Sequence, residues 1–139
     1  MPYCTQQDLV TRYGEDELIQ LTDKQNTGQL DTDVINLAIA DSDSMIDGYL
    51  GGRYSLPIDP LPRSLVRIAC EITRYYLYEN LAPDEVKDRY NEAVKSLKSI
   101  ARGELSIGIS TEGAKPLSQN TVKINTGGNV FNRKDKSFI

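Results

Sequence analysis

The sequence changes character at Gly103, and this break limits what the chain can fold into more than any other feature. Residues 1–103 carry dense helical patterns of apolar side chains and all eight tyrosines. Residues 104–139 contain 15 Gly, Ser, Thr or Asn residues, and both phenylalanines of the chain, Phe131 and Phe138, lie near their end. The first part is long enough for a helical core, whereas the second has too few apolar side chains to build one of its own.

Apolar periodicity and helix-capping residues predict the elements of the first part. Thr5, and either Asp31 or Thr32, are polar residues that suit helix starts, and Gly14 and Gly103 suit helix ends. Together these signals predict five helices, over about 5–13, 15–21, 32–50, 62–80 and 82–102.

The predicted fold class is therefore mostly α: a small bundle of about four to five helices over 1–103, followed by an extended C-terminal arm over 104–139. Within the arm, residues 105–109 and 122–124 alternate in the manner of short β-strands. Such segments would pair with each other or add to the sheet edge of a neighbouring chain.

The predicted helix over 62–80 is expected to be the central one. Apolar residues cover more than half of its circumference, which is typical of a helix wrapped by partners. The apolar residues are Leu65, Val66, Ile68, Ala69, Cys70, Ile72, Tyr75, Tyr76 and Leu77. A narrow polar strip remains, made of Arg67, Glu71, Arg74 and Tyr78.

Two interpretations of this polar strip stay open. Arg67 and Arg74 share a face with Glu71 between them, so the three form either an intrahelical ion-pair strip or salt bridges to a neighbouring subunit. In the second case the acids would come from the 31–47 segment, including Asp43 and Asp47, because residues 1–60 carry a net charge of −8 and residues 61–103 carry +2.

Catalytic chemistry is largely excluded by composition. The chain contains no histidine, which removes Ser/His/Asp and Cys/His nucleophile systems. Asp43 and Asp47 share a helix face, and we interpret them as a solvated or partner-facing acidic surface rather than as catalytic carboxylates. We therefore predict that the protein is not an enzyme.

No metal, cofactor or disulfide is predicted. Residues 23–34 match a calcium loop at Gly28 but place Val34 where the bidentate glutamate should stand. Cys4 and Cys70 lack ligand spacing, and we interpret them as buried or incidental reduced thiols, with Cys70 packing as a small apolar group in its helix. The sequence also lacks the pattern of a signal peptide and any run of 18 apolar residues, so no membrane association is expected.

Several collinear segments together resemble one family, the head–tail connector (adaptor) proteins of Mu-like phages and prophages. The most specific element is Ile46-Asp-Gly-Tyr-Leu50 followed by Gly52-Arg-Tyr54. The other matching segments are Tyr3 to Leu9, Leu18 to Asp23, Ile68 to Ile72 with Arg74-Tyr75, Tyr90 to Gly103, and Phe131-Asn-Arg-Lys-Asp135.

The resemblance implies a virion protein that assembles from the host cytoplasm into the neck, at the head–tail interface. It would form a ring, usually twelvefold, beneath the portal protein, close to packaged DNA, and would receive the neck and tail-completion proteins. Two other classes stay open from the residues alone: a regulatory or interaction module that never joins a virion, and a small carboxylate-dependent enzyme.

The end of the arm is expected to anchor the subunit to the portal or to a neighbouring adaptor. Phe131, Phe138 and Ile139 are too apolar to favour exposure to water. Arg133, Lys134 and Lys136 would pair with an acidic partner surface.

Overall fold

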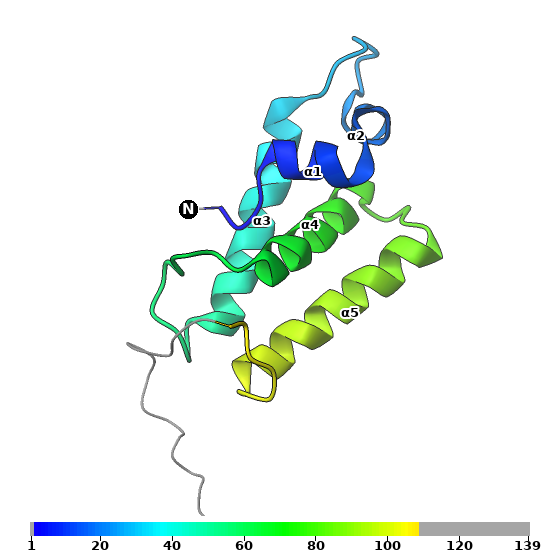
Figure 1. The fold of residues 1–139 in the computed structure, drawn as a ribbon. Coiled ribbons are helices and arrows are strands. Elements are labelled where there is room, and N and C mark those ends of the chain that lie inside the picture. The colour runs from blue at the N-terminus through cyan, green and yellow to red at the C-terminus, as the bar shows by residue number, and fades with distance from the viewer. Residues whose placement is uncertain (1, 109–139) are drawn as a thin grey trace, which may run out of the picture.

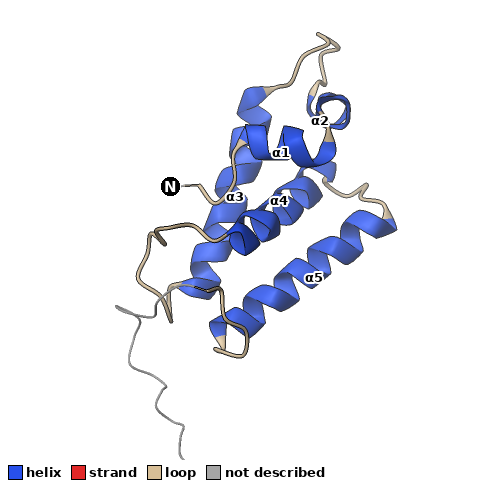
Figure 2. Ribbon diagram, in the orientation of Figure 1, coloured by secondary structure: helices blue, strands red, loops and turns tan. Residues whose placement is uncertain are grey.

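A computed structural model describes residues 2–108 of the chain. This part consists of five helices joined by loops and contains no strand (Figures 1 and 2). The helices are α1 (Gln6–Tyr13), α2 (Glu15–Thr22), α3 (Thr32–Leu50), α4 (Arg63–Tyr78) and α5 (Asp84–Ala101). The predicted mostly α-helical body is confirmed. The strand-like segment 122–124 lies outside the described residues, and residues 105–108 form no strand.

Local capping explains where the first and third helices begin. The Thr5 hydroxyl accepts a hydrogen bond from the Asp8 amide at 3.2 Å, and the Asp8 carboxylate accepts one from the Thr5 amide at 2.9 Å. This reciprocal pair satisfies two amides that the first turn of α1 leaves without helical partners. Asp31 caps α3 by accepting from the amides of Asp33 and Val34.

The centre of the molecule is α4, as the sequence predicts. It packs against each of the other four helices, and Figure 1 shows α3 and α5 on either side of it. Its buried residues include Leu65, Ile68, Ala69, Ile72 and Leu77. Because nearly every turn of α4 contributes to the core, this helix organises the packing of the other four.

The turn after α5 ends the helix in a Schellman motif. The Glu104 amide donates to the Ser99 carbonyl at 2.9 Å, and the Gly103 amide donates to the Ile100 carbonyl at 3.0 Å. Gly103 has a φ of 81°, in the left-handed region that glycine adopts at low cost. A Cβ at this position would lie 2.8 Å from the guanidinium carbon of Arg53, so Arg53 covers the turn closely.

We expect Gly103→Ala to lower the free energy of unfolding by about 1–2 kcal/mol, because alanine pays the steric cost of a left-handed backbone. The contact with Arg53 adds little, since the flexible end of that side chain can move. Gly48→Ala is the matched control. Gly48 lies inside α3 with open space around its Cα, so alanine there should raise stability by about 0.5–1 kcal/mol. Urea denaturation of both variants measures the two changes in the free energy of unfolding. Equal changes for Gly103→Ala and Gly48→Ala would contradict the left-handed conformation assigned to Gly103.

The core also includes residues outside the helices, from the connector between α3 and α4 and from the segment after α5. In the connector between α3 and α4, Tyr54 and Ile58 are buried. After α5, Ile107 is buried as well and belongs to the same apolar cluster. The first residues after Gly103 therefore still pack against the body.

Candidate interaction surfaces

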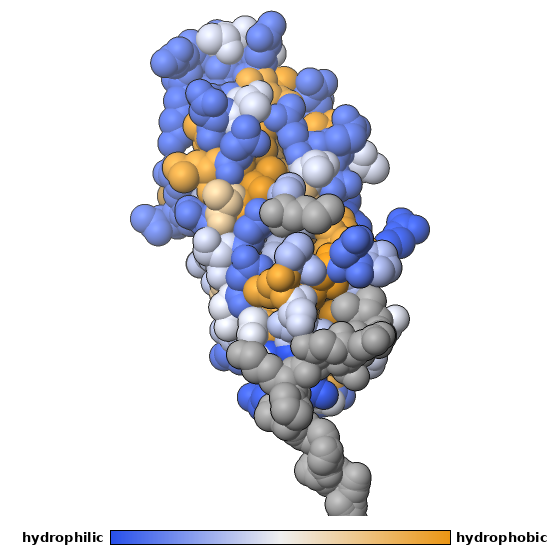
Figure 3. All heavy atoms as spheres, turned by 90° about the vertical axis from the view of Figure 1, so that its left-hand side faces the viewer, coloured by the Kyte–Doolittle hydropathy of each residue, from blue (hydrophilic) through white to orange (hydrophobic). Residues whose placement is uncertain are grey.

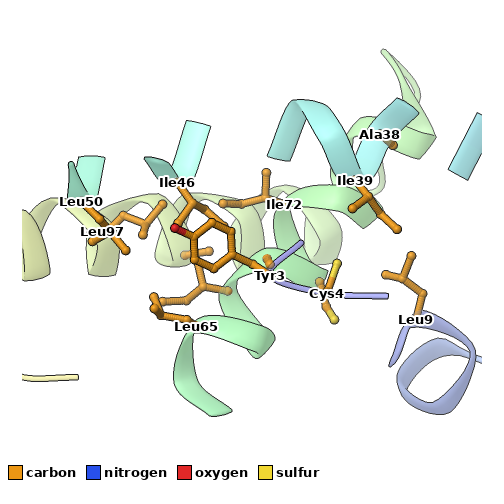
Figure 4. Close-up of a cluster of buried hydrophobic side chains, with 14 of the residues drawn as sticks. Tyr3, Cys4, Leu9, Ala38, Ile39, Ile46, Leu50, Leu65, Ile72 and Leu97 are labelled. Carbon is orange, nitrogen blue, oxygen red and sulfur yellow. The ribbon is translucent and has the colours of Figure 1, made fainter. Parts of the chain in front are cut away.

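The N-terminal segment is held against α3 by two aspartates. The Tyr3 amide donates to Asp43 Oδ1 at 3.0 Å, and the Tyr3 hydroxyl donates to Asp47 Oδ1 at 2.6 Å. The Tyr3 ring is buried, and Figure 4 shows it among Ile46, Leu65 and Ile72. The segment thus contributes a core side chain as well as two polar contacts.

The electrostatics of this contact favour the neutral phenol of Tyr3. Burial, together with the hydrogen bond to Asp47, raises the pKa of Tyr3 above its usual value. Burial also raises the pKa of Asp43, while the Tyr3 amide opposes that shift. Asp43 and Asp47, interpreted from the sequence as a solvated or partner-facing acidic surface, therefore have an intramolecular role that the helical wheel did not show.

Arg74 joins three helices within one chain. Its Nε lies 2.7 Å from Glu17 Oε2, and its Nη2 lies 3.0 Å from Glu17 Oε1, which makes a bidentate ion pair between α4 and α2. The guanidinium carbon also lies 4.3 Å from the centre of the Tyr13 ring in α1. The Glu17 hydrogen bond raises the pKa of Arg74, so the guanidinium stays charged.

Glu71 is buried rather than exposed on a polar strip. Only 6% of its surface is accessible, and its nearest cation is Arg89 of α5, with Arg89 Nη1 3.7 Å from Glu71 Oε1. The intrahelical ion-pair strip is therefore wrong, because Arg74 pairs with α2 and Glu71 faces α5. Of the four predicted strip residues, Arg67 is exposed and Tyr78 is half-buried.

We expect Arg74→Met to lower the free energy of unfolding by about 1–3 kcal/mol, because it leaves Glu17 without its charged hydrogen-bond partner. The side chains of Arg74 and Glu17 are only 12% and 24% accessible, so water replaces the contact poorly. Arg67→Met, at an exposed position of the same helix, should stay within about 0.5 kcal/mol of the natural protein. Chemical denaturation would contradict this account if both substitutions had the same small effect.

Two further side-chain contacts join α4 to its neighbours α5 and α3. The rings of Tyr75 and Tyr90 stack with centroids 4.0 Å apart, which links α4 to α5. Tyr76 contacts Met45 of α3 through its hydroxyl at 3.2 Å, and burial raises its pKa to about 12. Cys4 and Cys70 are both buried, and the burial of Cys70 confirms its predicted packing in the helix.

A shallow cavity opens beside the docked N-terminal segment. It has a volume of about 280 Å³ and lies between the end of α3 and the connector to α4; its lining residues include Tyr3, Asp47, Leu56, Pro57 and Ile58. Figure 3 views the side of the molecule that carries the N-terminal segment, α3 and the connector. Apolar side chains come to the surface there in several places between polar ones.

Two outward faces of opposite charge lie on α3 and α5. The helix α3 contains four aspartates and no basic residue. Asp33, Leu37 and Asp41 lie on its exposed side, and we call these three residues the acidic face. On α5, Lys95, Lys98 and Arg102 are exposed at spacings of three and four residues; these form the basic stripe.

The remaining sequence predictions concern the C-terminal anchor, metal binding and membrane association. The predicted anchor residues lie outside the described residues: Phe131, Arg133, Lys134, Lys136, Phe138 and Ile139. Within residues 2–108, no cluster of three or more Cys, Asp or Glu side chains is arranged to hold a metal ion. None of the five helices is long and apolar enough to cross a membrane.

Comparison with known proteins gives one consistent group of phage proteins. A family described as "Bacteriophage Mu, Gp36" matches residues 3–126. The chain is 33% identical over 138 residues to "Mu-like prophage FluMu protein gp36" of Haemophilus influenzae, covering 99% of this chain and 98% of the relative. It is 35% identical over 141 residues to "Gene product J" of Escherichia phage Mu, covering 100% of both chains.

Proposed function

Since the chain belongs to the Bacteriophage Mu Gp36 family of Mu-like phage proteins, we propose that it is a structural component of the virion, a head–tail connector. In this role the subunit forms a ring beneath the portal and joins the DNA-filled head to the neck of the tail. The ring is expected to share the usual twelvefold symmetry of rings on portals.

The observation that carries the proposal is the pair of outward faces with opposite charge on different helices of one small body. A subunit with two different complementary surfaces associates head to tail, and such contacts generate rings when the rotation closes. The resemblance of the Ile46–Leu50 and Gly52–Tyr54 elements to connector proteins supports the same role.

A structural rather than catalytic role is part of the proposal. The chain contains no histidine, and its most suggestive carboxylates, Asp43 and Asp47, are occupied with Tyr3. The proposed partners are other copies of this chain, the portal protein and the neck or tail-completion proteins. A net charge of −4 also suits a wall close to packaged DNA, because like charge discourages binding to phosphate.

We place the assembled protein in the neck of the virion and its synthesis and folding in the host cytoplasm. A protein that never joined a particle would instead be a regulatory or interaction module. Fractionation of purified particles separates these alternatives, because a connector stays with DNA-filled heads through density-gradient purification.

The isolated subunit is expected to be monomeric or weakly associated at micromolar concentration and to form a ring only on its portal. The physical reason is that exposed ion pairs are individually weak, so the contacts need a template that holds many subunits in register. Sizing chromatography with and without the portal protein of the same phage tests this. A stable ring without the portal, or no binding to the portal at all, would contradict it.

A further inference from the structure

We propose that the acidic face of α3 in one subunit packs against the basic stripe of α5 in the next subunit of the ring. This inference rests on the proposed connector function and specifies the surfaces that make its contact. Each of the two surfaces therefore binds another copy of the same chain.

Four of the five charged residues on the two surfaces take part in no ion pair within the described part of the chain. Asp33, Asp41, Lys95 and Lys98 take part in none of the ion pairs among residues 2–108. Arg102 makes one exposed contact, with its Nε 3.5 Å from Glu104 Oε1. The aspartates and lysines that form the two surfaces therefore keep their charges available for another molecule.

The acidic face also contains an apolar side chain in an unusual place. Leu37 is 65% exposed, and it lies one helical turn from Asp33 on one side and one turn from Asp41 on the other. Contact with a neighbouring subunit would remove this side chain from water, which favours association. The aliphatic stem of Lys98, at the middle of the basic stripe, is a suitable surface for it.

The spacing of the charges matches across the two helices. Asp33 and Asp41 are eight residues apart, about 12 Å along α3, and Lys95 and Arg102 are seven residues apart, about 10.5 Å along α5. Two helices laid side by side can therefore form an ion pair at each end, with Leu37 against Lys98 between them.

Charge and position favour a head-to-tail contact over a two-fold one. A two-fold dimer could pair the acidic face with the partner's basic stripe only if both surfaces lay in a single patch, because a two-fold contact uses the same patch of both subunits. Figure 1 shows α3 and α5 on either side of α4, so one subunit can use the two surfaces towards different neighbours. This is the arrangement that a ring requires.

A charge-reversal experiment with mixed subunits tests the inference. The first variant is Lys95→Glu with Arg102→Glu, and the second is Asp33→Lys with Asp41→Lys. Each variant alone should assemble on the portal at least tenfold less than the natural protein, because its two surfaces have like charge. An equimolar mixture should recover at least half of the natural yield, since each variant's altered surface fits the other's.

Controls separate assembly from folding. Arg63→Glu reverses the charge of an exposed residue on a different helix, α4, and should leave assembly unchanged. Melting temperatures should stay within about 4 °C of the natural protein, because the altered residues are at the surface. Asp33 lies in the first turn of α3, where an acidic residue stabilises the helix, so replacing it by lysine can lower the melting temperature further. The single variant Asp41→Lys, which keeps Asp33, then shows the effect on assembly without this loss of stability.

The outcomes distinguish this contact from the wider proposal. Normal assembly of either variant would show that the two surfaces do not meet, while the connector function would stand. Failure of the mixture to assemble would also overturn the contact and assign the affected surface to the portal. If the natural protein itself formed no ring on its portal, both the contact and the connector function would be wrong.

Discussion

Replacing Ile72 by alanine is expected to lower the free energy of unfolding by about 2–5 kcal/mol. The side chain is fully buried in the middle of α4, where it contributes to the cluster shown in Figure 4. Removing it leaves a cavity, because side chains fixed by four surrounding helices cannot collapse to fill the space. Leu65→Ala, about two turns earlier on the same helix, should fall in the same range.

The control for this experiment is Leu37→Ala on α3. Leu37 is 65% exposed, so its truncation should change stability by no more than about 0.5 kcal/mol. Chemical denaturation of the three variants compares them directly. Values below about 0.5 kcal/mol for both Ile72→Ala and Leu65→Ala would contradict the central position of α4.

Deleting residues 131–139 is expected to leave a normally folded body and to yield DNA-filled heads without tails. Residues 2–108 bury a core around α4 that includes Ile107, so we expect the melting temperature not to change. The deletion removes Phe131, Phe138 and Ile139 together with the basic trio Arg133, Lys134 and Lys136. If these residues anchor the subunit, infectious particles should fall by several orders of magnitude, as counted by plaque assay and electron microscopy.

A second variant separates the two parts of the anchor. Reversing Arg133, Lys134 and Lys136 to glutamate keeps the aromatic residues and removes the basic charge. This variant should also lose tail attachment if the anchor pairs with an acidic surface. Infectious particles at the natural yield from the deletion variant would show that this segment has no anchoring role.

The order and bounds of the helices could be predicted from the sequence because their signals are local. Thr5 and Asp31 cap the helices that they precede, and Gly103 ends α5 in the conformation that glycine favours. The wide apolar arc of α4 likewise predicted a central helix, because burial on most sides leaves a pattern in the sequence itself.

Contacts between distant residues could not be predicted in the same way. Arg74 and Glu17 are 57 positions apart, and Tyr3 and Asp47 are 44 apart. A helical wheel shows which residues share a face but not which neighbour covers it. Glu71 therefore looked like part of an exposed strip, although α5 packs over it and brings Arg89 within 3.7 Å.

The acidic surface was predicted more accurately as a region than as residues, whereas the basic surface was expected on α4, at Arg67 and Arg74, and not on α5. The excess of acid before residue 60 was visible in composition, and it underlies the acidic face of α3. Of the predicted interface residues, however, Asp43, Asp47 and Arg74 make contacts within their own chain. The residues free to contact a neighbour are found only once these internal contacts are known.

Electron cryomicroscopy of purified phage particles tests the connector role most directly. The account predicts a ring of five-helix bodies beneath the portal, with α3 of each subunit facing α5 of the next. Particles that infect normally but contain no copy of this protein in the neck would contradict it.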